Sequence, residues 1–418
     1  MPKPVGYCEL VRHNPNFRNL WFGQIISLLG DWFNLIASAS LIASLTQSGI
    51  AVGSLFVVRM LAPFLISPIA GVVSDRYNRK RLMIIADISR AVIVLGFLLV
   101  RSQEQIWFLY ALTALQLAIS GFFYPARSAI LPDVVSENEV GTANALGSST
   151  WSIMLAVGAA LGGIVAGQWG IYPSFVIDSA TFLVSAVFIA RVEYTPQLNL
   201  VAGSGTIAAA LKEYVEGLRY LIRNRRVLVV ALLKAASSLA TGAFQVIQVY
   251  LAEQIYMIGG GGSTSLGLMY AVVGAGTGFG PIIARRFTGD REDKMLAAIS
   301  WSYLLAAVGL AIVSPLPAFW VVLVGTFLRG LGGGVNWVFS TQVLLQSVPN
   351  RVLGRVFSTE FAMMTLASAG AAYYGGWGMD HPSLGVTGLM WSMVVMAVVF
   401  GVLWTLWITV EKRNKQTQ

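Results

Sequence analysis

Eight charged residues stand inside stretches of the sequence that are otherwise apolar, and these are the residues best placed to do chemistry. The acids are Asp31, Asp87, Asp178 and Glu360, and the bases are Arg59, Arg90, Lys234 and Arg329. An ionised side chain at the centre of a membrane helix costs at least ~2.5–3.5 kcal/mol, so such residues usually serve proton transfer, transport or mutual pairing. The formal charges of the set sum to zero. We interpret the acids as candidates for proton exchange and the bases as residues of the same central cavity.

Asp31 is the first candidate for a proton-coupling residue. It lies mid-span beside Gly30, where we expect the helix to be interrupted. Protonation would remove its attraction to a nearby base such as Arg59 or Arg90, and would shift the balance between two states of the cavity. Asp178 is the second candidate.

The competing interpretation is that these charges are structural pairs that lock helices together. Asp87 and Arg90 are three residues apart and share one helix face, so they can pair with each other. Glu360 lies near a predicted helix end. Among the aromatic residues, the sequence places three where the wall of a substrate cavity is expected: Trp32, Trp151 and Trp337.

The composition predicts an integral membrane protein. Of the 418 residues, 56% are hydrophobic and only 11% are charged, whereas soluble domains carry about 25% charged residues. The net charge of +9 does not indicate nucleic-acid binding, because most of the 28 basic residues fall in one set of alternate loops and the termini. That asymmetry predicts a multi-pass protein with both termini in the cytoplasm. One cysteine and two histidines make an internal disulfide or a metal site improbable.

The apolar runs predict an all-α fold of twelve membrane-spanning helices in two six-helix bundles. We expect helices at residues 20–45, 50–73, 82–100, 106–131, 143–168, 171–190, 227–252, 266–284, 295–313, 319–345, 356–377 and 386–410, each near the ~20 residues that cross a bilayer. The bundles are residues 1–190 and 227–418, because Gly71-x-x-x-Asp75-Arg76 is echoed by Gly280-x-x-x-Ala284-Arg285 half a chain later. In the linker, 191–226, the apolar periodicity over 207–222 predicts an amphipathic helix on the membrane surface.

A short basic hairpin between the second and third predicted spans is expected to form a cytoplasmic gate. The gate residues are Gly71, Asp75, Arg76, Arg79, Lys80, Arg81 and Asp133. We expect Gly71 to allow close helix approach and Asp75 to face the start of the predicted eleventh helix. Arg79 is expected near Asp133. Such a latch would hold the cytoplasmic side closed.

This hairpin, G-x-x-x-D-R-x-x-R-K-R over residues 71–81, resembles the signature loop of the major facilitator superfamily of secondary transporters. Other segments are similar to its enterobactin-exporter and macrolide-efflux branch, namely Gly30-Asp31-Trp32, Asp87-x-x-Arg90, Tyr124-Pro125-Ala126-Arg127, Asp178 and Arg351-x-x-Gly354-Arg355. The resemblance implies a monomeric inner-membrane protein that exports a siderophore, macrolide or similar amphiphilic small molecule. Export would be driven by a proton gradient through antiport, with alternating access and no other cofactor.

One departure from the family pattern lies in the fifth span. There Gly158-Ala-Ala-Leu-Gly162-Gly163 resembles an antiporter motif, with Ala159 in place of its proline. The glycines Gly274 to Gly280 resemble a dinucleotide-binding loop but lack the strand that such a loop follows, so helix packing is the better interpretation.

Two alternative functions stay open. One is a lysophospholipid transporter or flippase of the same fold, which would work without strict proton coupling. The other is a membrane receptor that transports nothing, in which the interior charges would be fully paired and dry. An enzyme is not expected, because the loops are too short to hold a catalytic domain.

Overall fold

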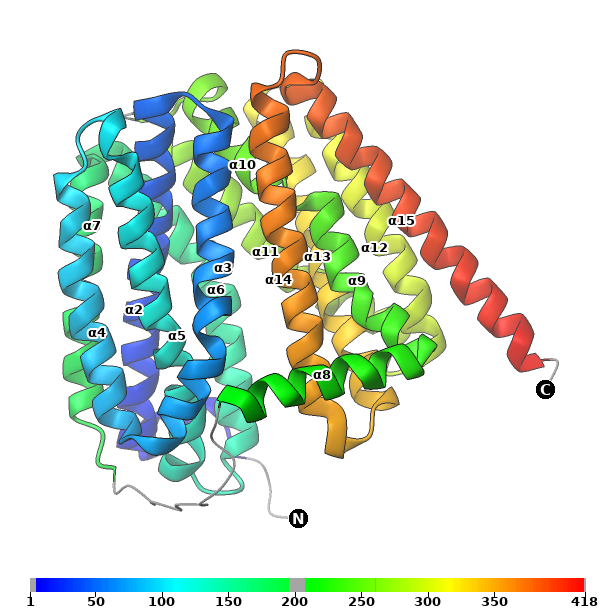
Figure 1. Ribbon diagram of the computed structural model, residues 1–418, viewed down its shortest axis with the longest axis horizontal. Helices are drawn as coiled ribbons and strands as arrows, with labels where there is room; N and C mark the ends of the chain where they lie inside the picture. The colour runs from blue at the N-terminus through cyan, green and yellow to red at the C-terminus, as the bar shows by residue number, and fades with distance from the viewer. Residues whose placement is uncertain (1–4, 195–206, 260, 417–418) are drawn as a thin grey trace. The chain divides into compact units, whose positions relative to one another are not determined.

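The computed structural model describes residues 5–194, 207–259 and 261–416, and these residues form helices without a strand (Figure 1). The helices are α1 Tyr7–His13, α2 Pro15–Thr46, α3 Gly49–Arg76, α4 Arg79–Leu95, α5 Ile106–Val134, α6 Val140–Trp169, α7 Ile171–Ala190, α8 Ile207–Arg223, α9 Arg225–Thr241, α10 Phe244–Tyr250, α11 Ser263–Thr288, α12 Glu292–Val313, α13 Phe319–Ser347, α14 Asn350–Asp380 and α15 Gly385–Gln416. Short 3-10 turns follow α4 at Gly96–Leu99 and precede α5 at Gln103–Gln105, and a π-turn, Leu251–Ile255, follows α10.

Eleven helical segments in the described ranges are long and apolar enough to cross a membrane. Helix α14 occupies the place of the remaining predicted span and has 31 residues, but it carries charge near its start. The predicted all-α membrane fold is confirmed. The chain is therefore a multi-pass membrane protein.

The chain divides into two compact units. Unit 1 comprises Met1–Leu45, Leu61–Lys212 and Met257–Gly267, and unit 2 comprises Thr46–Met60, Glu213–Tyr256 and Leu268–Gln418. The division falls inside α3 and α8, and near the start of α11. The bundle boundaries predicted at residues 190 and 226 stay a prediction.

In unit 1, α4 packs against α5 and α7. The predicted interruption of the first span at Gly30 is wrong, because α2 is one unbroken helix of 32 residues. A glycine is tolerated inside a helix at a cost of about 1 kcal/mol relative to alanine. Its role here is close approach to α7, as described below.

In unit 2, α12 packs against α13 and α15, and α11 approaches α13 through glycines. A Cβ at Gly276 or Gly280 would lie 2.6 Å or less from a backbone oxygen of α13, and one at Gly330 would lie 2.9 Å from the oxygen of Val273 on α11. The glycine run in α11 is therefore a packing surface, as predicted.

The predicted seventh span is not one continuous helix. Helix α9 ends at Thr241 and α10 begins at Phe244, with the Gly242 N–H donating to Ser238 O at 2.7 Å between them. The π-turn that follows contains Glu253, which is 7% exposed. Helix breaks and π-turns of this kind are frequent at functional sites.

The predicted basic hairpin is shorter than expected. Helix α3 continues to Arg76 and α4 starts at Arg79, so only two residues connect them. Asn78 caps α4 by accepting a hydrogen bond from the Arg81 N–H at 3.0 Å, which is a favourable helix start. No described atom lies within 4 Å of a Cβ built on Gly71, and its predicted role in close helix approach stays a prediction.

The predicted amphipathic helix is present as α8, over Ile207–Arg223. Glu216 pairs with Arg355 on α14 at 2.8 Å, and Gly217 lies against the backbone of Arg355. Leu221 is fully buried, whereas Leu218 and Ile222 are exposed. These exposed apolar residues suit the predicted position on the membrane surface.

Candidate functional site: buried charges within each unit

Unit 1 contains a buried ion pair on α4. Asp87 is 0% exposed and Arg90 is 1% exposed. Arg90 Nη2 donates to Asp87 Oδ1, and Ser185 on α7 donates to Asp87 Oδ2 at 2.7 Å. The predicted pairing of Asp87 with Arg90 is confirmed, and its three-residue spacing on one helix explains why the two side chains meet.

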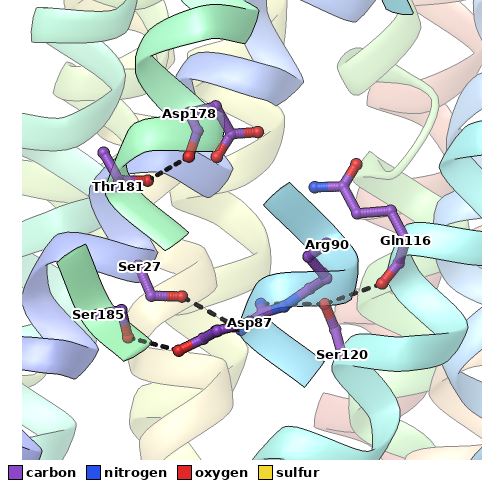
Figure 2. A network of polar contacts seen from close by, with 8 residues as sticks. All are labelled: Ser27, Asp87, Arg90, Gln116, Ser120, Asp178, Thr181 and Ser185. Carbon is purple, nitrogen blue, oxygen red and sulfur yellow. Dashed lines mark hydrogen bonds and ion pairs between the residues drawn. The ribbon is translucent and has the colours of Figure 1, made fainter. Parts of the chain in front are cut away.

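Arg90 is held by contacts from three further helices (Figure 2). Its Nη1 donates to Ser120 on α5 at 3.2 Å, and its Nη2 approaches Ser27 on α2 at 3.5 Å. The guanidinium carbon lies 4.2 Å from the ring centre of Phe182 on α7 and 4.8 Å from that of Phe123 on α5. A cation between two aromatic faces is stabilised by both ring quadrupoles. The pair therefore ties α2, α4, α5 and α7 together.

A second acidic position lies where α2 meets α7. A Cβ at Gly30 would overlap Thr181 Oγ1 and Asp178 Oδ1, so these helices touch only because residue 30 has no side chain. Asp178 is 0% exposed, and Thr181 Oγ1 donates to the Asp178 backbone oxygen at 2.7 Å (Figure 2). Asp31, the next residue along α2, is half-buried.

Three carboxylates thus lie near one another in the interior of unit 1. Asp178 contacts Gly30, the residue next to Asp31 in the sequence. Like charges at short range in a low-dielectric interior are not all ionised together. Arg90 neutralises Asp87 directly. Asp31 and Asp178 therefore both belong to the region where α2 meets α7.

Unit 2 contains the second buried pair, between Lys234 on α9 and Glu360 on α14. Their side-chain atoms lie 3.0 Å apart, and Lys234 also donates to Thr341 on α13 at 2.8 Å. The ammonium lies 4.5 Å from the ring centre of Trp337. Lys234 and Glu360 are 7% and 2% exposed. The pair joins α9, α13 and α14.

We expect Glu360→Gln to lower the free energy of unfolding by about 3 kcal/mol, because breaking a buried pair leaves one charge uncompensated. The double variant Lys234→Met with Glu360→Gln is expected to regain most of that loss. Thermal unfolding in detergent would measure both, with the exposed Asp290→Asn as control. Equal melting temperatures for the single and double variants would contradict a paired charge.

The other two predicted bases also belong to unit 2. Arg329 on α13 lies over the ring of Phe244 at 4.5 Å and lines a small cavity of about 50 Å³ with Ser237 and Thr241. Both Arg329 and Arg59 on α3 are within electrostatic reach of the Tyr270 hydroxyl. The residues described as lining the cavity include no acid, so Arg329 makes this part of unit 2 a basic environment.

The three predicted cavity tryptophans differ in their surroundings. Trp32 packs over Gly158 on α6, where a Cβ would lie 2.9 Å from its ring. Trp337 covers Lys234, as described above, and is 49% exposed. Trp151 on α6 is 52% exposed. Their predicted role as substrate contacts stays a prediction.

Among the predicted gate residues, Arg79 and Asp133 meet as expected. Arg79 Nη1 lies 2.8 Å from Asp133 Oδ2 and donates to Ala129 O at 2.9 Å, so the start of α4 is fixed to the end of α5. Arg76 and Arg81 are exposed and Lys80 is partly exposed. Asp75 lies in the last turns of α3, and its side chain falls outside the described residues, so its predicted contact stays a prediction.

Several buried polar residues were not predicted from the sequence. Gln116 and Asn34 are each 1% exposed, and Glu253 is 7% exposed. Arg127 on α5 donates to Gln24 on α2. An uncharged amide is less costly to bury than a charge, so hydropathy alone gives it no signal.

Comparison with known proteins supplies the family. Residues 20–369 match the model of the Major Facilitator Superfamily. The chain belongs to this superfamily. It is therefore a membrane transporter and not an enzyme, as predicted.

Three relatives in this superfamily have names that describe export. A Bacillus subtilis protein named as the bacilysin exporter BacE is 27% identical, with 84% of this chain and 86% of the relative covered. Macrolide efflux protein A of Streptococcus pyogenes is 22% identical over 84% of this chain and 86% of its own length. The enterobactin exporter EntS of Shigella boydii is 23% identical, with 98% of this chain and 95% of the relative covered.

The fold is also found among solved structures. A crystal structure of a bacterial homologue of the human lysosomal transporter Spinster, in an inward-facing conformation, superposes with a TM-score of 0.72 at 14% identity. The superposition covers 95% of this chain and 97% of the chain in that crystal structure. The predicted fold of this superfamily transporter is confirmed by both comparisons.

Proposed function

We propose that this transporter exports an amphiphilic small molecule in exchange for protons. The observation that carries the proposal is the contact of α2 with α7, where Asp178 Oδ1 lies against Gly30 and Asp31 is the next residue along α2. One proton on this pair removes a negative charge from the interior of unit 1, and so changes the balance between two conformations. The relatives named for export of bacilysin, macrolides and enterobactin support the direction of transport.

The same proposal covers the position of the substrate, the energy source, the cellular location and the oligomeric state. Substrate is held near mid-membrane and released by alternating access of the two halves. The proton gradient supplies the energy without another cofactor. The basic loops support a location in the inner membrane with both termini in the cytoplasm, and a monomer suffices for this mechanism.

Within this proposal, Asp31 is the exchanging residue and Asp178 its partner. Asp31 is half-buried and can reach water, whereas Asp178 is 0% exposed. Asp87 and Glu360 are occupied by Arg90 and Lys234, and they serve chiefly to hold helices together.

Replacing Asp31 by Asn is expected to abolish transport driven by a pH gradient, because an amide cannot take up and release the proton. Inside-out vesicles energised by respiration would be tested for uptake of radiolabelled erythromycin and enterobactin. The control is Asp290→Asn, at an exposed carboxylate between α11 and α12.

Full uptake by Asp31→Asn would remove that residue as the coupling site. Uptake by the unchanged protein that resists an uncoupler would remove proton exchange altogether, and labelled lysophospholipid would then be the next substrate to test. Thermal stability of each variant in detergent would separate lost coupling from lost folding.

A further inference from the structure

A long groove runs along the outside of unit 2 between α12 and α15, which lie side by side (Figure 1). Its volume is about 660 Å³. Its walls are mostly apolar, and the lining residues Trp301, Leu304, Val398 and Val402 are 46–66% exposed. Trp301 is 66% exposed and Val402 is 51% exposed. On membrane-spanning helices, such a surface faces hydrocarbon.

The two ends of the groove differ in charge. Lys412 and Arg413, in the last turns of α15, line one end and are exposed. The described lining residues include no acid. The neighbouring Glu411 pairs with Arg226 on α9 at 2.8 Å, and Arg226 also pairs with Glu292 on α12.

The length of the groove matches one leaflet. From Lys412 to Val398 the helix rises about 21 Å at 1.5 Å per residue. A bilayer is about 40–45 Å thick with its head-group regions, so one leaflet measures about 20–22 Å. The basic end thus falls at head-group depth when the apolar end reaches the middle of the membrane.

Hydroxyl groups line the groove between these ends. Thr405 Oγ1 donates to Gly401 O at 2.7 Å and lies 3.0 Å from Ser300 Oγ on α12, whose hydroxyl can donate to it. Thr409 donates to Thr405 O at 2.8 Å. Trp404 donates to Leu296 O at 3.0 Å beneath them. These bonds fix the spacing of α12 and α15, so the groove is a built feature of unit 2.

We propose that this groove binds one anionic phospholipid. The acyl chain lies along Trp301 and Val402, and the phosphate lies between Lys412 and Arg413. Basic pockets between membrane helices at a leaflet surface select acidic head groups in this way. The site is separate from the buried charges of the transport proposal and does not depend on it.

The test uses the full chain in nanodiscs of phosphatidylcholine with increasing phosphatidylglycerol. Lipids brominated on the acyl chain quench the fluorescence of a nearby tryptophan. The fluorescence of Trp301 is obtained as the difference between the unchanged protein and the Trp301→Phe variant. We expect brominated phosphatidylglycerol to quench Trp301 at a much lower mole fraction than brominated phosphatidylcholine does.

The double variant Lys412→Gln with Arg413→Gln is expected to weaken phosphatidylglycerol binding by about 30-fold, from about 1 kcal/mol for each base. A matched control, Arg285→Gln with Arg286→Gln at the end of α11, should leave it unchanged. Val402→Phe, which fills the groove, should reduce quenching by both lipids.

Equal quenching by the two lipids, unchanged in the Lys412 and Arg413 variant, would overturn the proposal and leave only bulk lipid in the groove. An equal loss in the α11 control would overturn it too, because the preference would then reflect the overall charge.

Discussion

Replacing Arg90 by methionine is expected to lower the free energy of unfolding by 3–5 kcal/mol, as for other buried pairs that lose one partner. Asp87 would be left 0% exposed without its ionic partner, with Ser185 as its hydrogen-bond donor. The aromatic contacts of Arg90 with Phe123 and Phe182 would be lost as well. Unfolding in detergent, followed by circular dichroism, measures the effect.

The matched variants separate charge from packing. Asp87→Asn combined with Arg90→Met removes both charges, and should recover a large part of the loss in a double-mutant cycle. Arg285→Met, on an exposed side chain of unit 2, should change stability by less than about 0.5 kcal/mol. Equal losses in the single Arg90 variant and the double variant would show that packing, not charge, dominates.

Replacing Gly30 by valine is expected to abolish transport and to lower the free energy of unfolding by about 1–3 kcal/mol through overpacking. The new side chain would occupy the space of Thr181 Oγ1 and Asp178 Oδ1, so α2 and α7 would be forced apart where the proposed proton site lies. Uptake in inside-out vesicles and thermal unfolding would record the two effects.

Gly141→Ala is the control for this substitution. Gly141 lies in the first turn of α6, and no described atom lies within 4 Å of a Cβ there. Alanine should stabilise that helix by up to about 1 kcal/mol. Gly30→Ala combined with Thr181→Ala restores room beside α7 and should regain part of the stability. A fully active Gly30→Val protein would contradict the close contact.

Contacts within one helix or across a short connection could be predicted from the sequence. Asp87 and Arg90 are three residues apart and share a helix face. Short-range spacing fixes such partners before any tertiary structure is known. The apolar runs predicted the spans for the same reason, since length and hydropathy are local properties.

Contacts between distant segments could not be predicted in this way. Ser185 is 98 residues from Asp87, and nothing in its neighbourhood marks it as a ligand of that carboxylate. Gly30 was expected to break a helix, because a glycine signals either a break or a close contact, and only the position of α7 decides between them. The break at Gly242 was missed, since the apolar run continues through it.

The glycines of α13 limit how unit 2 can move. A Cβ built on Gly325 or Gly332 would lie 2.6 Å or less from a carbonyl oxygen of α12, and one built on Gly334 would lie equally close to a carbonyl oxygen of α11. The backbone of α13 therefore packs directly against both helices. Helices that touch through their backbones have no side-chain rotamers at the contact that could adjust when one helix slides along another. We therefore expect α11, α12 and α13 to move together as a rigid body, and unit 2 to bend at its edge, where α9 ends and α10 begins.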